Sequence, residues 1–140
     1  VRLRFKKMLL LGMAAWVIRY LFFAFGNIGS NLWMLYAGII LHGICYDFFF
    51  VTGQIYTDNK AGERIKNSAQ GLITFATYGL GMLIGSLASG FITEKYVLTV
   101  SGIIHYQWKS IWLIPGALAG IVMIFFALFF KEKLSHKRNV

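Results

Sequence analysis

The sequence predicts an all-α integral membrane protein with four transmembrane helices, and three observations support this fold class. Hydrophobic residues make up 58% of the 140 residues and charged residues only 14%, whereas soluble domains carry about 25% charged residues. A small globule buries only about two thirds of its surface, so a chain of this length needs lipid around its apolar side chains. The mean hydropathy is +0.65, and the apolar residues fall into four runs close to the roughly 20 residues that span a bilayer.

The four runs predict helices of similar length joined by short segments. The first contains Arg19 as its only charged residue, the third contains none, and the fourth contains the kink-prone Pro115 near its outer end. A β-branched stretch at 97–104 is compatible with a short interfacial strand, which is too brief to change the fold class. The predicted helices are residues 8–25, 32–57, 68–92 and 110–130, followed by a cytoplasmic tail at 131–140.

The basic residues predict the orientation in the membrane. If the N-terminus is cytoplasmic, eleven of the 14 lysines and arginines lie on the inner side, which satisfies the positive-inside rule and places both ends in the cytoplasm. We therefore expect a multi-pass protein of the cell (inner) membrane. The inner basic residues are Arg2, Arg4, Lys6, Lys7, Lys60, Arg64, Lys66, Lys131, Lys133, Lys137 and Arg138. The outer side holds Lys95 and Lys109, together with the interfacial aromatic residues Trp33, Tyr106, Trp108 and Trp112.

The same pattern argues against other classes of protein. The formal net charge of +9 sits in clusters outside the apolar runs, and no basic face interleaves with exposed aromatic residues, so no nucleic-acid partner is expected. The single Cys45 lies inside an apolar run and predicts neither a disulfide nor a metal site. His42 and Asp47 lack a third partner at a recognisable spacing, and no metalloprotease, phosphate-loop or dinucleotide motif occurs. We therefore expect neither an enzyme nor a bound cofactor.

The second helix carries the residue that is most costly to place in lipid. Asp47 lies about 21 Å along the helix from Trp33 by the helical rise. A carboxylate at such a depth costs on the order of 3 kcal/mol, so it must face water, become protonated or pair with a cation. One stripe, at steps of four, three and four, contains Gly43, Asp47, Phe50 and Gln54, with His42 and Tyr46 on the adjoining face.

Arg19 is the cation within the predicted spans, and its depth matches that of Asp47. By the helical rise, Arg19 lies about 16 Å and Asp47 about 15 Å from the inner ends of their helices. One interpretation is a structural ion pair between the two side chains. The other is that Asp47 faces a substrate or proton pathway, and both hold if the pair breaks and re-forms during transport.

The third helix has one stripe whose inner part is polar and whose outer part is small. The small residues allow close helix packing, and the inner polar residues either pack or line a wet cavity. The stripe consists of Gln70, Thr74, Thr77, Gly81, Gly85 and Ser89. The fourth helix repeats the small-residue pattern at Gly116 and Gly120, for which packing is the interpretation.

Several short motifs occur in the order and spacing of a known family. They are Trp16-Val-Ile-Arg-Tyr20, His42-Gly-Ile-Cys-Tyr-Asp-Phe-Phe49, Ser68-Ala-Gln-Gly71, Gly85-Ser-Leu-Ala-Ser-Gly90 and Ile111-Trp112. Together they resemble the nucleoside:proton symporter family of the major facilitator superfamily. The resemblance covers nearly the whole chain and aligns it with helices nine to twelve of a twelve-helix transporter. Because the chain opens at Val1 in a basic stretch, we expect a C-terminal fragment that helices one to eight of the same protein precede.

This resemblance implies proton-coupled nucleoside transport by alternating access, with the tenth and eleventh helices bordering a central cavity. Family members place an aspartate and the aromatic residue before it in the nucleoside pocket, and here these are Asp47 and Tyr46. Asp47 is then expected to accept hydrogen bonds from ribose hydroxyls or to take part in proton coupling, and Tyr46 to pack against the base or sugar. Phe50 and His42 complete the implied pocket, and its cavity lining is expected to include Gln54, Gln70, Thr74 and Thr77.

Two departures from the family pattern leave alternatives open. His42 replaces a tyrosine of well-known members, which bears on nucleoside selectivity, and Arg4 replaces a glycine of the loop before helix nine. A major facilitator transporter for a sugar or another small metabolite is therefore an alternative. A stand-alone four-helix membrane interaction protein is a second alternative.

Overall fold

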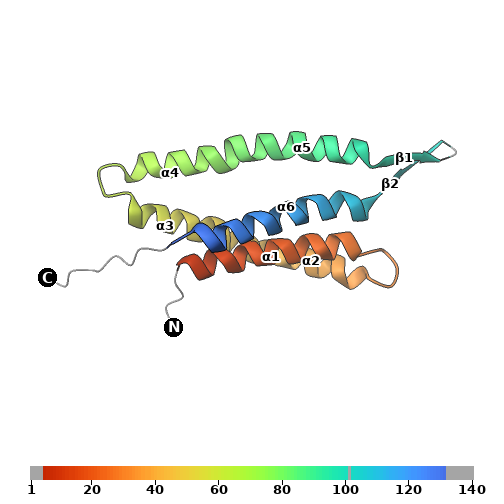
Figure 1. Cartoon of the computed structure of the whole chain (residues 1–140), viewed down its shortest axis with the longest axis horizontal. Coiled ribbons are helices and arrows are strands. Elements are labelled where there is room, and N and C mark those ends of the chain that lie inside the picture. Colours follow the sequence, from red (N-terminus) through yellow and green to blue (C-terminus); the bar gives the residue numbers. More distant parts are fainter. Residues whose placement is uncertain (1–4, 101, 132–140) are drawn as a thin grey trace.

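The computed structural model describes residues 5–100 and 102–131, which form four long helical spans and one hairpin (Figure 1). All four spans are long and apolar enough to cross a membrane, so the predicted fold class is confirmed. The first span is α1 (Phe5–Phe25) and the last is α6 (Trp108–Phe129). The second consists of α2 (Leu32–Tyr46), η1 (Asp47–Val51) and α3 (Thr52–Lys60). The third consists of α4 (Lys66–Thr74), η2 (Phe75–Gly81) and α5 (Met82–Lys95).

The observed helices begin and end within three residues of the predicted bounds. The β-branched stretch forms a hairpin between the third and fourth spans, in which β1 (Val97–Val100) pairs antiparallel with β2 (Ile103–Tyr106). Gly102 makes the turn with φ of 80°, a backbone conformation that glycine adopts without steric cost. Predictions that concern Arg2, Arg4, the tail beyond residue 131, and the lysines and arginine within that tail lie outside the described residues.

Packing in the described part is concentrated on α1, which lies against α2 and α6, whereas the third span stands to one side (Figure 1). No residue is buried in the most apolar window of the third span. Such exposure of apolar side chains suits helices whose solvent is lipid or other membrane helices, because no hydrophobic force drives them out of lipid.

Small residues set how closely α1 approaches its neighbours. A Cβ atom added at Gly12 would lie 2.9 Å from the backbone nitrogen of Phe49, so only glycine fits this contact with η1. A Cβ at Gly116 would lie 3.1 Å from the Cβ of Tyr20, which brings α6 close to α1. These glycines allow the backbone-to-backbone approach that is typical of membrane helix pairs.

Contacts at one end of the bundle join three spans. Lys6 Nζ donates to the carbonyl oxygen of Ala127 over 2.7 Å. The ring of Tyr56 lies 5.6 Å from that of Phe5 and 5.7 Å from that of Phe130. The start of α1, the end of α3 and the end of α6 therefore lie at the same end of the molecule, as Figure 1 also shows.

Two π-helical segments interrupt the longer spans. η1 covers Asp47–Val51 in the second span and η2 covers Phe75–Gly81 in the third. π-Helical turns are rare, and they occur frequently at functional sites because they redirect side chains within a continuous helix. The two π segments therefore mark the place where a site is to be sought.

Candidate functional site

The π segments lie at similar depths in neighbouring spans. Tyr46, directly before η1, is about 16 Å from Thr57, and Tyr78, within η2, is about 15 Å from Ser68, by the helical rise. Both distances are close to half of the roughly 30 Å hydrocarbon core. The two tyrosines consequently lie near the middle of the predicted membrane layer.

Tyr46, Phe50 and Tyr78 form an aromatic cluster that we call the aromatic clip. The hydroxyls of Tyr46 and Tyr78 are joined by a hydrogen bond of 2.5 Å. The ring of Phe50 stacks on that of Tyr78 with centroids 5.4 Å apart, and it lies 5.1 Å from the ring of Tyr46. Separations of this size are favourable for aromatic pairs. The clip joins the second and third spans near their middle.

Helix α1 supports the clip from the opposite side. The ring of Trp16 meets Phe49 edge-on at 5.4 Å and Phe50 edge-on at 5.6 Å. Since Gly12 admits the backbone of Phe49, the same helix also fixes the position of η1. The Phe50 ring is thus held between Trp16 on one side and Tyr78 on the other.

Asp47 and His42 lie beside the clip without partners in the described part of the chain. Both residues are exposed, and neither side chain forms a hydrogen bond, ion pair or ring contact with another described residue. Within 5–100 and 102–131, no group of three or more His, Cys, Asp or Glu residues could hold a metal ion. Asp47 therefore presents an unpaired carboxylate next to an aromatic surface, which is suited to a ligand with hydroxyl donors.

The predicted Arg19–Asp47 ion pair is not present. Among the described residues, the ion pair within 4.0 Å is Lys66–Asp58, at 3.3 Å. The Arg19 guanidinium instead lies over the ring of Phe23, 5.3 Å from its centroid, and its Nε atom is buried with no hydrogen-bond partner. Matching depth does not fix direction around a helix axis, and Arg19 points toward the ring layer that α1 shares with α6.

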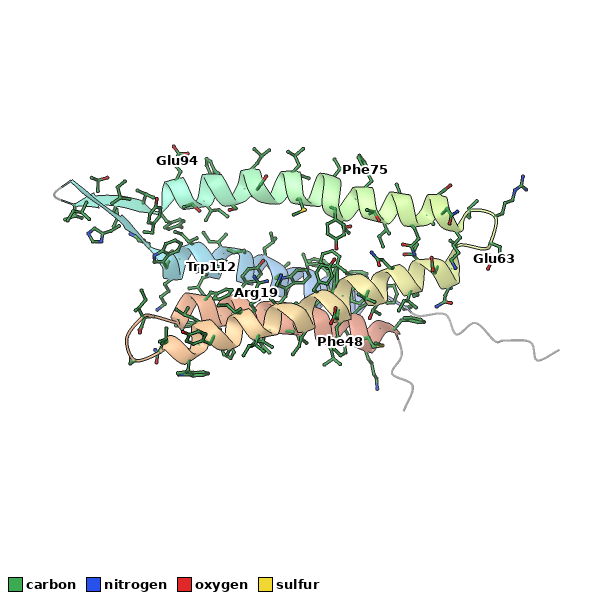
Figure 2. All side chains as sticks on the ribbon, turned by 180° about the vertical axis from the view of Figure 1, so that it is seen from behind. Arg19, Phe48, Glu63, Phe75, Glu94 and Trp112 are labelled. Atoms are coloured by element: carbon green, nitrogen blue, oxygen red, sulfur yellow. The ribbon has the colours of Figure 1, made fainter. Side chains whose placement is uncertain are left out.

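Figure 2 shows Arg19 and Trp112 in this layer. The Phe23 ring connects them, because its centroid is 5.0 Å from that of Trp112. The Tyr20 ring also stacks with that of Trp112, with centroids 6.0 Å apart. The ring that Arg19 contacts therefore belongs to an aromatic cluster, and no described carboxylate pairs with the guanidinium.

The polar residues in the first half of the third span have different surroundings. Gln70 Nε2 donates to the Gln54 carbonyl oxygen at 2.8 Å and to Asp58 Oδ1 at 2.5 Å. Thr77 Oγ1 donates to the Ile73 carbonyl oxygen of its own helix at 2.7 Å. The Thr74 side chain is exposed and has no hydrogen bond of its own. Gln70 thus bridges two spans, and a cavity-lining role for these residues stays a prediction.

The small residues of the third and fourth spans also differ in their surroundings. Gly116 is buried against α1, whereas a Cβ at Gly120 would meet nothing within 4 Å. Gly81, Gly85 and Ser89 are exposed in the described structure. Their predicted packing role remains a prediction, since no neighbouring helix covers them within the described residues.

An apolar cavity of about 320 Å³ lies between α1, η1 and α6. Its lining residues are Met13, Trp16, Tyr20, Phe49, Pro115, Leu118, Ala119 and Val122. None of the predicted pocket residues Asp47, Tyr46, His42 and Phe50 lines it. The candidate site is therefore the open face that carries the aromatic clip and Asp47.

Sequence reasoning missed Tyr78 as a member of this site. It follows Thr74 by four residues, so helical periodicity places it near the polar stripe of the third span. A tyrosine in the middle of an apolar run is also unusual, because such rings prefer the membrane interface. These two signals together could have identified it.

Four helices that are long and apolar enough to cross a membrane carry a polar and aromatic site near the middle of the predicted membrane layer, an arrangement that is typical of membrane transport proteins. Comparison with known families agrees, since the family model described as nucleoside H+ symporter matches residues 1–135. The chain belongs to the nucleoside H+ symporter family, within the major facilitator superfamily.

Individual relatives are nucleoside transporters. The chain is 38% identical over 136 residues to the putative nucleoside transporter YegT of Escherichia coli, covering 94% of this chain and 32% of YegT. It is 30% identical over 142 residues to the xanthosine permease of Escherichia coli, covering 97% of this chain and 33% of the permease. The chain spans about a third of the length of these relatives.

A solved structure shows the same fold. The crystal structure of the nucleoside transporter NupG superposes with a TM-score of 0.80 at 29% identity, over 91% of this chain and 31% of the NupG chain. The predicted resemblance to this family, and to one part of its fold, is therefore confirmed.

Proposed function

We propose that this chain forms part of a secondary active transporter that carries nucleosides together with protons across the cell membrane by alternating access. The observation that carries the proposal is the unpartnered Asp47 carboxylate beside the aromatic clip, near the middle of the second span. The match to the nucleoside H+ symporter family over residues 1–135 supports it. Substrate sites near the bilayer midplane, between rocking bundles, are typical of such transporters.

In this proposal Asp47 is the principal substrate or proton residue. An unpaired carboxylate at mid-depth costs on the order of 3 kcal/mol, which ribose hydroxyl donors or protonation would offset. The Tyr46 ring packs against the base or sugar, since aromatic faces bind such planar groups. Phe50 and His42 complete the pocket, and the inner exit is lined by Gln54, Gln70, Thr74 and Thr77.

The proposed orientation places the ends of α1 and α6 that meet at Lys6 in the cytoplasm. The Lys6–Ala127 hydrogen bond supports having both on one side of the membrane. The excess of lysine and arginine at that end supports the inner side. The exposed Trp33 and Trp108 rings fit the outer interface, where amphipathic rings are enriched.

The experiment is uptake of labelled uridine by the full-length protein carrying Asp47→Asn, measured across a range of pH. We expect uptake to fall at least tenfold, because Asn cannot accept the same charge-assisted hydrogen bonds or bind a proton. Glu94→Gln is the matched control. Glu94 is an exposed acidic residue near the end of α5, and its side chain has no described partner. Undiminished uptake by the Asp47 variant at every pH would remove Asp47 from the mechanism.

A sugar or another small metabolite is the second candidate cargo, because the departure at His42 from the family pattern bears on nucleoside selectivity. His42 is exposed one turn before Tyr46 and stands where well-known family members have a tyrosine. Competition of nucleosides against sugars for the same uptake separates the two cargoes. If sugars inhibit that uptake and nucleosides do not, a sugar cargo would replace the nucleoside proposal.

A further inference from the structure

We propose that Tyr78 is a positioning residue of the substrate site, which holds the ring of Tyr46 beside Asp47 through the bond between the two tyrosine hydroxyls. The hydroxyl pair also donates one hydrogen bond to an acceptor atom of the nucleoside. This inference rests on the proposed transport function and adds a residue of the third span to its site.

The hydrogen-bonding capacity of the pair supports the second part of the proposal. Each tyrosine hydroxyl has one hydrogen to donate and also accepts. Whichever hydroxyl donates within the Tyr46–Tyr78 bond, the other keeps its own hydrogen. Neither hydroxyl forms a hydrogen bond with any other described residue, so this remaining hydrogen is available to a ligand.

The placement of the pair supports the first part. Tyr46 precedes Asp47 directly in the chain, because Tyr46 is the last residue of α2 and Asp47 the first residue of η1. A change in the Tyr46 ring therefore alters the surface next to the carboxylate. Tyr78 fixes that ring from two directions, by the hydroxyl bond and through Phe50, which contacts both tyrosine rings.

The Tyr46–Tyr78 bond also depends on the relative position of the second and third spans. The third span has no buried residue in its most apolar window. Its described side-chain contacts with the second span are the Gln70 bonds and the Lys66–Asp58 ion pair at the α4 end, and the clip near the middle. Movement of the third span away from the second would break the Tyr46–Tyr78 bond and release the Tyr46 ring. The substrate site is therefore complete when the two spans are joined.

The test uses the full-length protein with Tyr46→Phe, Tyr78→Phe and both together. These substitutions remove only the hydroxyl oxygens and keep the rings, so the clip stays packed. Uridine binding to purified protein and uridine uptake are measured for each variant. Tyr56→Phe is the control, because its ring packs between Phe5 and Phe130 and its hydroxyl has no described partner.

We expect each single variant to bind uridine roughly fivefold more weakly, the effect of one hydrogen bond between neutral groups. The double variant should be no weaker than the weaker single variant, because the two hydroxyls act as one unit. KM should rise with kcat nearly unchanged, which separates lost substrate binding from general damage to the transporter.

Three other outcomes decide against parts of the scheme. Wild-type affinity in Tyr78→Phe would overturn the role of Tyr78 and leave the transport function intact. Additive losses in the double variant would overturn the positioning through Tyr46. A wild-type protein that neither binds nor takes up uridine would overturn the proposed nucleoside function itself, together with the inference that rests on it.

Discussion

The side-chain amide of Gln70 donates both of its hydrogens to the second span, one to Oδ1 of Asp58 at 2.5 Å and one to the Gln54 carbonyl oxygen. Lys66 completes the arrangement with an ion pair to the other oxygen of Asp58 at 3.3 Å. Gln70 and Lys66 join α4 to α3 across the loop between the two helices. These contacts and the aromatic clip hold the third span against the second at two points along its length.

Replacing Gln70 by Glu is expected to separate α4 from α3. The change removes both donors and places a second carboxylate against Asp58, and like charges in contact repel. We expect the Tm of the full-length protein to fall by a few degrees. Gln107→Glu is the matched control, since Gln107 is exposed beside the hairpin and only its backbone forms described hydrogen bonds. Equal Tm values for the two variants would show that the Gln70 amide does not join the spans.

Gly12→Ala is expected to destabilise the protein. The added methyl group would lie 2.9 Å from the backbone nitrogen of Phe49, and backbone atoms of η1 cannot move aside as a flexible side chain can. Overpacking of this kind costs about 1–3 kcal/mol. Thermal unfolding of the full-length protein should show the loss.

The control for Gly12 is Gly120→Ala, where the new methyl group meets nothing within 4 Å. This variant should keep or slightly raise the Tm, since alanine is favoured over glycine in a helix by about 1 kcal/mol. An unchanged Tm in Gly12→Ala would mean that α1 and η1 can separate without loss.

Arg19→Met is expected to raise stability and lower transport. The Nε atom is buried without an acceptor, so methionine, a long and flexible apolar side chain, removes a desolvation penalty that no described carboxylate offsets. The gain should be about 1–3 kcal/mol, measured as a higher Tm. Uridine uptake should fall, because cations retained within membrane spans usually serve function.

Arg64→Met, in the exposed loop between α3 and α4, is the control and should change neither the Tm nor uridine uptake. A drop in the Tm of Arg19→Met would instead indicate that the contact with Phe23 outweighs the desolvation penalty.

The four spans could be predicted from sequence because their signal is the length and continuity of apolar residues, which lipid requires whatever the neighbours are. The family motifs also lie in continuous stretches, and the family match confirms them. The Arg19–Asp47 pair was predicted from depth alone. Direction around each helix depends on how the spans pack, and the Phe23 and Trp112 rings occupy the side of α1 on which Arg19 lies.

The π segments and the role of Tyr78 could not be predicted by counting in helical turns. Whether a backbone N–H bonds to the carbonyl four or five residues earlier depends on small differences in packing, which composition does not reveal. The Tyr46–Tyr78 bond further requires that two spans 32 residues apart in sequence meet at one height. The predicted stripe from Gln70 to Ser89 therefore assumed regular α-helical turns throughout, whereas the η2 segment within it is π-helical.

The π turn in η2 leaves the two halves of the third span out of phase with each other. Residues spaced by four lie along one line on the surface of α4, and the same holds on α5. The wider π-helical turns of η2 between them displace this line, so it does not continue from α4 to α5. Gln70 and Ser89 therefore belong to two separate lines. Removing or adding one residue between 75 and 81 would turn α5 by about 100° relative to α4. A chimaera that exchanges this helix with a relative must preserve the residue count here, even where every side chain is replaced.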